Sequence, residues 1–271
     1  GALHALAQLV PILGHARHLT LPTPSSLRTA IFDVALPSMP RALALSSQQL
    51  LMLVFTGIAS VAGIGAVASL SFASNLQSVP LTVIGISYAA ALFPALASLF
   101  ASGDKMGFAR EVWASVRHVI FWTFPAITMI IVLRAQIVRV ILGSGNFTWS
   151  DTRLTAALVA LFAVSLIAQS LMLLFSRAYY AAGNTVVPVI VNVGGAIAAG
   201  LLAYGGVLWL ATAEFPRYFM ESLFRVSDTA GVASLMIPLA YSVSLIVAAG
   251  VFAYLFAQRF GYEARTADTF I

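Results

Sequence analysis

The amino-acid sequence predicts an all-α integral membrane protein with six membrane-spanning helices, preceded by the end of another helix. Of the 271 residues, 61% are hydrophobic and 8% are charged, and the mean hydropathy is +0.97. Soluble domains carry about 25% charged residues, so this composition is typical of the membrane class. One stretch, from Gly65 to Arg110, runs without charge for about 35 residues. Because a helix needs only about 20 apolar residues to cross the hydrocarbon core, this stretch predicts a membrane span.

The chain begins with a short apolar segment, residues 1–13, that starts at Gly1. It is too short to cross a membrane and lacks the basic start of a signal peptide. We interpret it as the end of a truncated membrane helix, and therefore expect the sequence to be a fragment of a longer transporter. Residues 14–28 contain two prolines, small polar residues and basic charges, and are predicted to form a cytoplasmic loop.

Apolar runs separated by polar turns predict the complete spans. They cover about residues 29–63, 66–101, 108–142, 150–181, 185–211 and 228–258. Pro37 and Pro40 should kink the first span, because each removes a backbone donor. Ser150 or Asp151 is expected to cap the fourth span. The polar end, residues 259–271, is predicted to be a cytoplasmic tail.

The second span is unusually polar in its first half. Its polar residues just before Pro80 are Ser69, Ser71, Ser74, Asn75, Gln77 and Ser78. Such groups are costly when they face lipid, so they should face other helices or water. This half of the span is therefore expected to line a cavity.

The connection before the last span has a different pattern, which predicts a short helix in the membrane interface near residues 215–225. Its apolar residues recur at helical spacing at Phe215, Tyr218, Phe219 and Leu223, with Met220 as a further candidate for this face. Its charged residues Arg217, Glu221 and Arg225 fall at i, i+4 intervals on another face.

The distribution of charge between alternate loops predicts the orientation in the membrane. One side collects nine basic and five acidic residues, and the other collects five basic and four acidic residues. By the positive-inside rule the first side is cytoplasmic, which places both ends of the chain there.

The composition also argues against several function classes. Cysteine is absent, and the four histidines are scattered without nearby carboxylates, so we expect no metal and no cofactor. No residues form a Ser-His-Asp set or a Gly-rich phosphate loop before a suitable helix, so the protein is not expected to be an enzyme. The small basic excess does not indicate a nucleic-acid partner.

Polar side chains inside the spans are the candidate site residues. If the hydrocarbon core begins near Ile31, Arg41 lies ten residues and about 15 Å deeper, close to the middle of the membrane. One interpretation is that Arg41 faces a cavity or a partner. The other is that it caps carbonyls freed by the two prolines, or that its side chain snorkels to the membrane surface. Other candidates for substrate contact are Gln48, Asn75, Gln77 and Arg177, followed by Gln49, Gln169 and Asn192. Interhelical hydrogen bonding is the simpler role for the amides, and complementing a helix dipole is the simpler role for Arg177.

Several stretches resemble one known family in the same order. Residues 71–97, SFASNLQSVPLTVIGISYAAALFPALA, resemble the eighth helix of the MurJ/MviN family of lipid II flippases. Residues 141–166 and 173–193 resemble the segments that lead into its tenth and eleventh helices, and residues 231–261 resemble its twelfth. The family commonly has Arg at the position of Asn75, Asp at that of Ser74 and Asp at that of Asn184.

The resemblance implies the second six-helix lobe of a two-lobed flippase fold, with the N-terminal lobe missing here. It implies a multi-pass protein of the bacterial inner membrane that moves lipid II, the polyprenyl-pyrophosphate-linked peptidoglycan precursor, to the outer leaflet by alternating access. Its partners would be this lipid-linked substrate, the membrane lipids and the missing lobe. The alternatives are an exporter of another polyprenyl-linked glycan or of small molecules, and a non-transporting membrane scaffold.

Overall fold

The computed structural model describes residue 42 and residues 46–145, 147–226, 229 and 231–261, and the described part is built from helices. The first is the helix Ser46–Ala62. The others are α3 (Ala66–Pro80), η2 (Leu81–Ile86), α4 (Ser87–Ala101), α5 (Lys105–Leu142), α6 (Trp149–Ala181), α7 (Val186–Thr212), α8 (Glu214–Phe224), η3 (Val232–Leu235) and α9 (Met236–Phe260).

Five helical segments are long and apolar enough to cross a membrane, which confirms the predicted all-α membrane class. One runs without a break through α3, η2 and α4, and another through η3 and α9; α5, α6 and α7 are the rest. The predicted span 29–63 is described only over Ser46–Ala62. The expected truncated helix 1–13, the loop 14–28, Arg41 and nearly all of the tail 259–271 lie outside the described residues.

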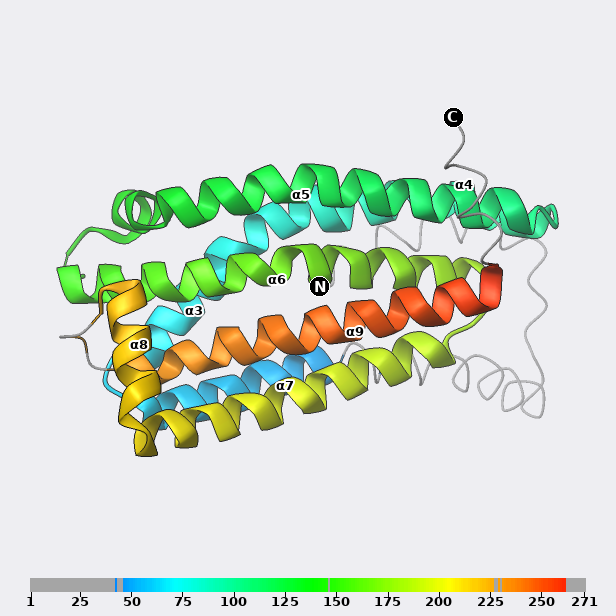
Figure 1. Ribbon diagram of the computed structural model, residues 1–271. Coiled ribbons are helices and arrows are strands. Elements are labelled where there is room, and N and C mark those ends of the chain that lie inside the picture. The colour runs from blue at the N-terminus through cyan, green and yellow to red at the C-terminus, as the bar shows by residue number, and fades with distance from the viewer. Residues whose placement is uncertain (1–41, 43–45, 146, 227–228, 230, 262–271) are drawn as a thin grey trace, which may run out of the picture. The chain divides into compact units, whose positions relative to one another are not determined.

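Helix α6 lies at the centre of the described bundle (Figure 1). It packs against α5 and α9 and against the continuous helix formed by α3, η2 and α4. In the most apolar stretch of α6, 72% of the residues are buried, whereas only 6% are buried in the most apolar stretch of α5. A helix that is apolar all round belongs in such a central position. Helix α5 therefore turns most of its apolar surface outward, where a bilayer would cover it.

Hydroxyl groups and small residues join α9 to its neighbours. Ser242 donates a hydrogen bond to the carbonyl of Leu161 in α6 at 2.8 Å, and Ser244 donates one to the carbonyl of Gly195 in α7 at 2.7 Å. Short side chains at such contacts let membrane helices approach closely. At the opposite end from α8, aromatic rings fill the core between α5, α6 and α9. They include Phe108, Phe175, Tyr179, Phe252 and Phe256.

The helix that contains Pro80 continues through the proline by widening into the π-helical turn η2. Proline has no N–H to donate, so carbonyls of the preceding turn need other partners. In the same turn the carbonyl of Ser78 accepts from the Leu81 amide and also from the Thr82 hydroxyl, the latter at 2.8 Å. The wide turn also brings Gly85 against α6, where it is buried. A Cβ at Gly85 would lie 2.8 Å from the Ser170 hydroxyl oxygen.

The start of α6 differs from the predicted cap. Thr148, rather than Ser150 or Asp151, is the N-cap, and Asp151 completes a capping box. The Thr148 hydroxyl accepts from the Asp151 amide at 3.3 Å, and the Asp151 carboxylate accepts from the Thr148 amide at 2.9 Å. The reciprocal pair satisfies two amide groups at once, which a single cap at Ser150 would not do.

Single cysteines provide a test of the predicted orientation, since the chain has none of its own. Ser102 and Ser144 are exposed just outside the two ends of α5, whose 38 residues span about 57 Å. We expect a membrane-impermeant thiol reagent to label Ser102→Cys only from the cytoplasm and Ser144→Cys only from outside. Labelling of Ser102→Cys in intact cells would reverse the assigned topology.

Candidate functional site

A polar strip runs along the exposed side of α3 and into η2. It is formed by Ser71, Asn75, Ser78 and Thr82, which recur at i, i+4, i+7 and i+11 and are all exposed. The hydroxyl of Ser78 donates to the carbonyl of Asn75 at 2.7 Å. The Asn75 amide has no hydrogen-bond partner among the described residues, so its donors and acceptor remain available to a ligand.

An apolar strip lies beside the polar strip on the same helix. It consists of Phe72, Val79 and Val83, and Val79 and Val83 have 62% and 67% of their surface exposed. The two strips together occupy the side of the helix that faces away from α6, because the residues packed inward are Ala66, Ser69, Leu70, Ala73 and Gln77. In a membrane the apolar strip suits lipid. In the polar strip the Ser78 and Thr82 hydroxyls already donate to helix carbonyls, so it is the Asn75 amide that needs water, protein or a polar ligand.

Gln77 points to the opposite side of α3 from Asn75 and is buried. Its amide nitrogen donates to the hydroxyl of Ser165 in α6 at 3.4 Å. That hydroxyl also accepts from the Gln169 amide at 2.6 Å and donates to the carbonyl of Phe162 at 2.6 Å. The structure thus separates two residues that the sequence grouped together. Gln77 holds α3 on α6, and Asn75 is free to meet a ligand.

A cavity of about 320 Å³ lies inside the lobe, between the helix Ser46–Ala62, η2, α6, α7 and α9. Its polar lining residues are Gln48, Gln169, Ser176, Arg177, Tyr180, Asn192 and Tyr241. Its apolar lining residues include Leu81, Met172 and Leu245. The cavity therefore has the volume and mixed lining of a small-ligand site.

Two predicted site residues, Gln48 and Arg177, meet in this cavity although they lie far apart in the sequence. Arg177 is partly buried and forms no ion pair or hydrogen bond within the described part of the chain. Asn192 is already engaged, because its amide donates to the carbonyl of Pro188 at 2.7 Å. Arg177 is accordingly the charged group in this lining best placed to bind an anion.

Sequence reasoning missed Ser165, Ser176 and Tyr241. Ser165 and Ser176 are single hydroxyls in a long apolar run, which more often satisfy a helix carbonyl than meet a ligand. Tyr241 is buried in α9, and its surroundings in the sequence, an apolar span with two serines, do not set it apart from a core aromatic residue. Within the described residues, no group of three or more His, Asp or Glu side chains is placed to hold a metal ion.

The sequence and the fold both match known proteins. The family model of the lipid II flippase MurJ matches residues 1–270. A probable lipid II flippase MurJ of Rhizobium meliloti is 30% identical over 191 residues, which cover 69% of this chain and 36% of that protein. A probable lipid II flippase MurJ of Bdellovibrio bacteriovorus is 32% identical over 126 residues, which cover 46% of this chain and 24% of that protein.

A solved structure of the lipid II flippase MurJ, in an inward closed conformation, has the same fold. It matches with a TM-score of 0.62 at 19% sequence identity, and the match covers 88% of this chain and 45% of that one. The chain therefore spans less than half the length of the proteins that it resembles.

Proposed function

Since this chain belongs to the lipid II flippase MurJ family, we propose that it forms one lobe of a flippase for lipid II. The whole protein would move this polyprenyl-pyrophosphate-linked precursor from the cytoplasmic to the outer leaflet of the bacterial inner membrane. The second lobe would come from the rest of the protein. The observation that carries the proposal is the polar strip of α3, which is exposed and does not pack against the part of the lobe that the structure describes.

The two strips of α3 suit the two parts of such a substrate. A sugar and pyrophosphate head group loses its hydration when it enters the hydrocarbon region, and this is costly unless protein groups replace the water. Asn75 offers an amide with donors and an acceptor, and the Ser78 and Thr82 hydroxyls, which donate to helix carbonyls, offer acceptor oxygens. The polyprenyl tail needs no such protection and would lie along Phe72, Val79 and Val83. The head group would then cross between the lobes while the tail stays in lipid.

Alternating access requires two lobes that rock against each other around a site near the middle of the membrane. In this proposal the polar strip of α3 faces the other lobe, and Gln77 keeps α3 fixed on α6 during the movement. Arg177 and Gln48 would offer a second polar site inside the lobe, with Arg177 binding phosphate oxygens. Arg41 stays a predicted substrate contact, based only on the depth in the membrane that its position in the sequence implies.

The proposal is tested by replacing the native flippase of a bacterial cell. The full-length protein that contains this chain should restore growth to cells depleted of their own lipid II flippase, and newly made precursor should become accessible on the outer leaflet. The isolated chain should do neither, because it supplies one lobe. If the full-length protein is abundant in the membrane and exposes no lipid II, another exported substrate or a scaffold role replaces the proposal.

A further inference from the structure

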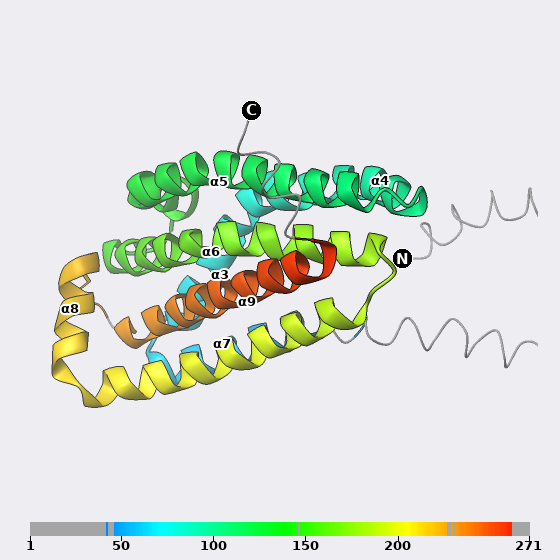
Figure 2. The ribbon, with the colours of Figure 1, turned by 45° about the vertical axis from the view of Figure 1, so that its right-hand side comes forward.

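The position of α8 follows from the helix before it. Helix α7 has 27 residues and is about 40 Å long, which exceeds the roughly 30 Å of hydrocarbon in a bilayer. Ala213 alone separates the end of α7 from the start of α8, so α8 begins where the chain leaves the hydrocarbon. It runs crosswise to α6, α7 and α9 at one end of the bundle in both views (Figures 1 and 2).

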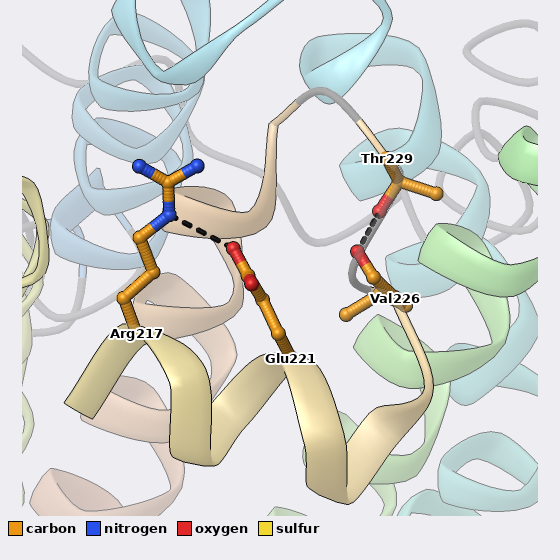
Figure 3. Close-up of polar contacts among 4 residues, drawn as sticks. All are labelled: Arg217, Glu221, Val226 and Thr229. Atoms are coloured by element: carbon orange, nitrogen blue, oxygen red, sulfur yellow. Dashed lines mark hydrogen bonds and ion pairs between the residues drawn. The ribbon is translucent and has the colours of Figure 1, made fainter. Parts of the chain in front are cut away.

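One side of α8 is fixed to the lobe. Met220 and Glu221 are buried, and the Glu221 carboxylate accepts a hydrogen bond from the Arg217 guanidinium at 2.8 Å (Figure 3). This hydrogen bond and the charge of Glu221 raise the pKa of Arg217 above its ordinary value. The pair compensates the buried carboxylate, so the packed side of α8 leaves no ionised carboxylate without a partner.

The other side of α8 is apolar and exposed. Phe215, Tyr218, Phe219 and Leu223 share this face, and Phe215 has 82% of its surface exposed. Four large side chains of this kind on an 11-residue helix leave an apolar face without cover from the described part of the lobe. An apolar face of this kind is typical of a helix that meets another protein or a membrane.

Two further exposed aromatic residues lie at the end of the bundle where α8 lies. Trp149 begins α6 and Trp209 lies in the last turn of α7, and both are exposed. Tryptophan and tyrosine concentrate at the boundary between hydrocarbon and water, because their rings are apolar and carry one polar group. With Tyr218 in α8, they form an aromatic belt at the end of the bundle where α8 lies.

We propose that the partner of α8 is the lipid surface of the outer leaflet, with Phe215, Phe219 and Leu223 inserted at the boundary between head groups and acyl chains. An amphipathic helix lying in the interface buries its apolar face in this way. Exposed Arg225, at the end of α8 in a left-handed conformation with φ 56°, is available to lipid phosphates. The inference concerns anchoring in the membrane and does not depend on which substrate the protein moves.

Spin labels on single cysteines test the anchor in the full-length protein, reconstituted into vesicles of phosphatidylethanolamine and phosphatidylglycerol. The labelled variants are Phe215→Cys, Phe219→Cys and Leu223→Cys. Ser144→Cys, on an exposed turn at the same end, is the control. Collision of each label with oxygen, which concentrates in lipid, is compared with collision with a water-soluble nickel chelate. We expect the ratio of oxygen to nickel collision to be several-fold higher at the three α8 positions than at Ser144→Cys.

Two outcomes would overturn the inference. Nickel collision as frequent on α8 as at Ser144→Cys would mean that the apolar face points into water. Low collision with both reagents, together with crosslinking of Phe219→Cys to another protein segment, would make the partner the other lobe or a second copy. Thermal melting of each variant should match the parent protein, since the replaced side chains are exposed.

Discussion

Replacing Asn75 with leucine is expected to cut the rate of lipid II transport by roughly tenfold or more in the full-length protein, while the melting temperature stays unchanged. The Asn75 amide has no partner among the described residues, so its loss removes no contact that holds the lobe together. If the polar strip meets the head group during crossing, leucine removes one or two hydrogen bonds of about 1 kcal/mol each and presents an apolar group to polar sugar. Outer-leaflet exposure of newly made precursor measures the effect.

Val79→Leu is the matched control for this prediction. Val79 is one helical turn further along α3 and is also exposed, but it belongs to the apolar strip. The same introduced side chain should therefore leave transport intact at Val79. Equal loss of transport in both variants would point to a general effect of larger side chains on α3. Full transport by Asn75→Leu would remove the polar strip from the substrate path.

Replacing Gly85 with leucine is expected to destabilise the lobe by about 3 kcal/mol or prevent its accumulation in the membrane. A Cβ at this position would lie 2.8 Å from the Ser170 hydroxyl oxygen and 3.3 Å from the Ser170 Cα, so α6 has no space for a side chain there. The backbone of η2 would have to move away from α6, which would open the contact that positions the polar strip. Thermal melting in detergent gives the measurement.

A milder pair of substitutions tests whether the contact between Gly85 and Ser170 causes this loss of stability. Gly85→Ala should lower the melting temperature, and adding Ser170→Ala should recover part of the loss, because it removes the nearest atom. Ser170→Ala alone should be harmless, since its buried hydroxyl has no hydrogen-bond partner among the described residues. Gly194→Ala, in α7 with open space around it, is the control and should not destabilise the protein. Additive effects of Gly85→Ala and Ser170→Ala would contradict direct contact between the two positions.

The resemblance noted in the sequence is confirmed by the family match. That resemblance implies Arg at position 75, where this chain has Asn, and the difference changes the chemistry of the strip. An amide offers hydrogen bonds without charge, so this strip suits sugar hydroxyls better than pyrophosphate. The charge for the phosphates would then come from Arg177, Arg41 or the other lobe.

The sequence alone determined the membrane class and the all-α character of the described part. Both depend on local properties, namely the length of apolar runs and the position of polar turns. It also indicated the amphipathic pattern of α8, because Phe215, Phe219 and Leu223 recur at helical spacing within a charged segment.

The tertiary structure alone decided which polar residues could act together. In membrane spans the side facing lipid and the side facing another helix are both apolar, so periodicity does not show which side of a helix is packed. The structure therefore placed Gln77 against Ser165 and left Asn75 exposed, although the two are neighbours in the sequence. It likewise brought Gln48 and Arg177 to one cavity, because packing around α6 joins helices that are distant along the chain.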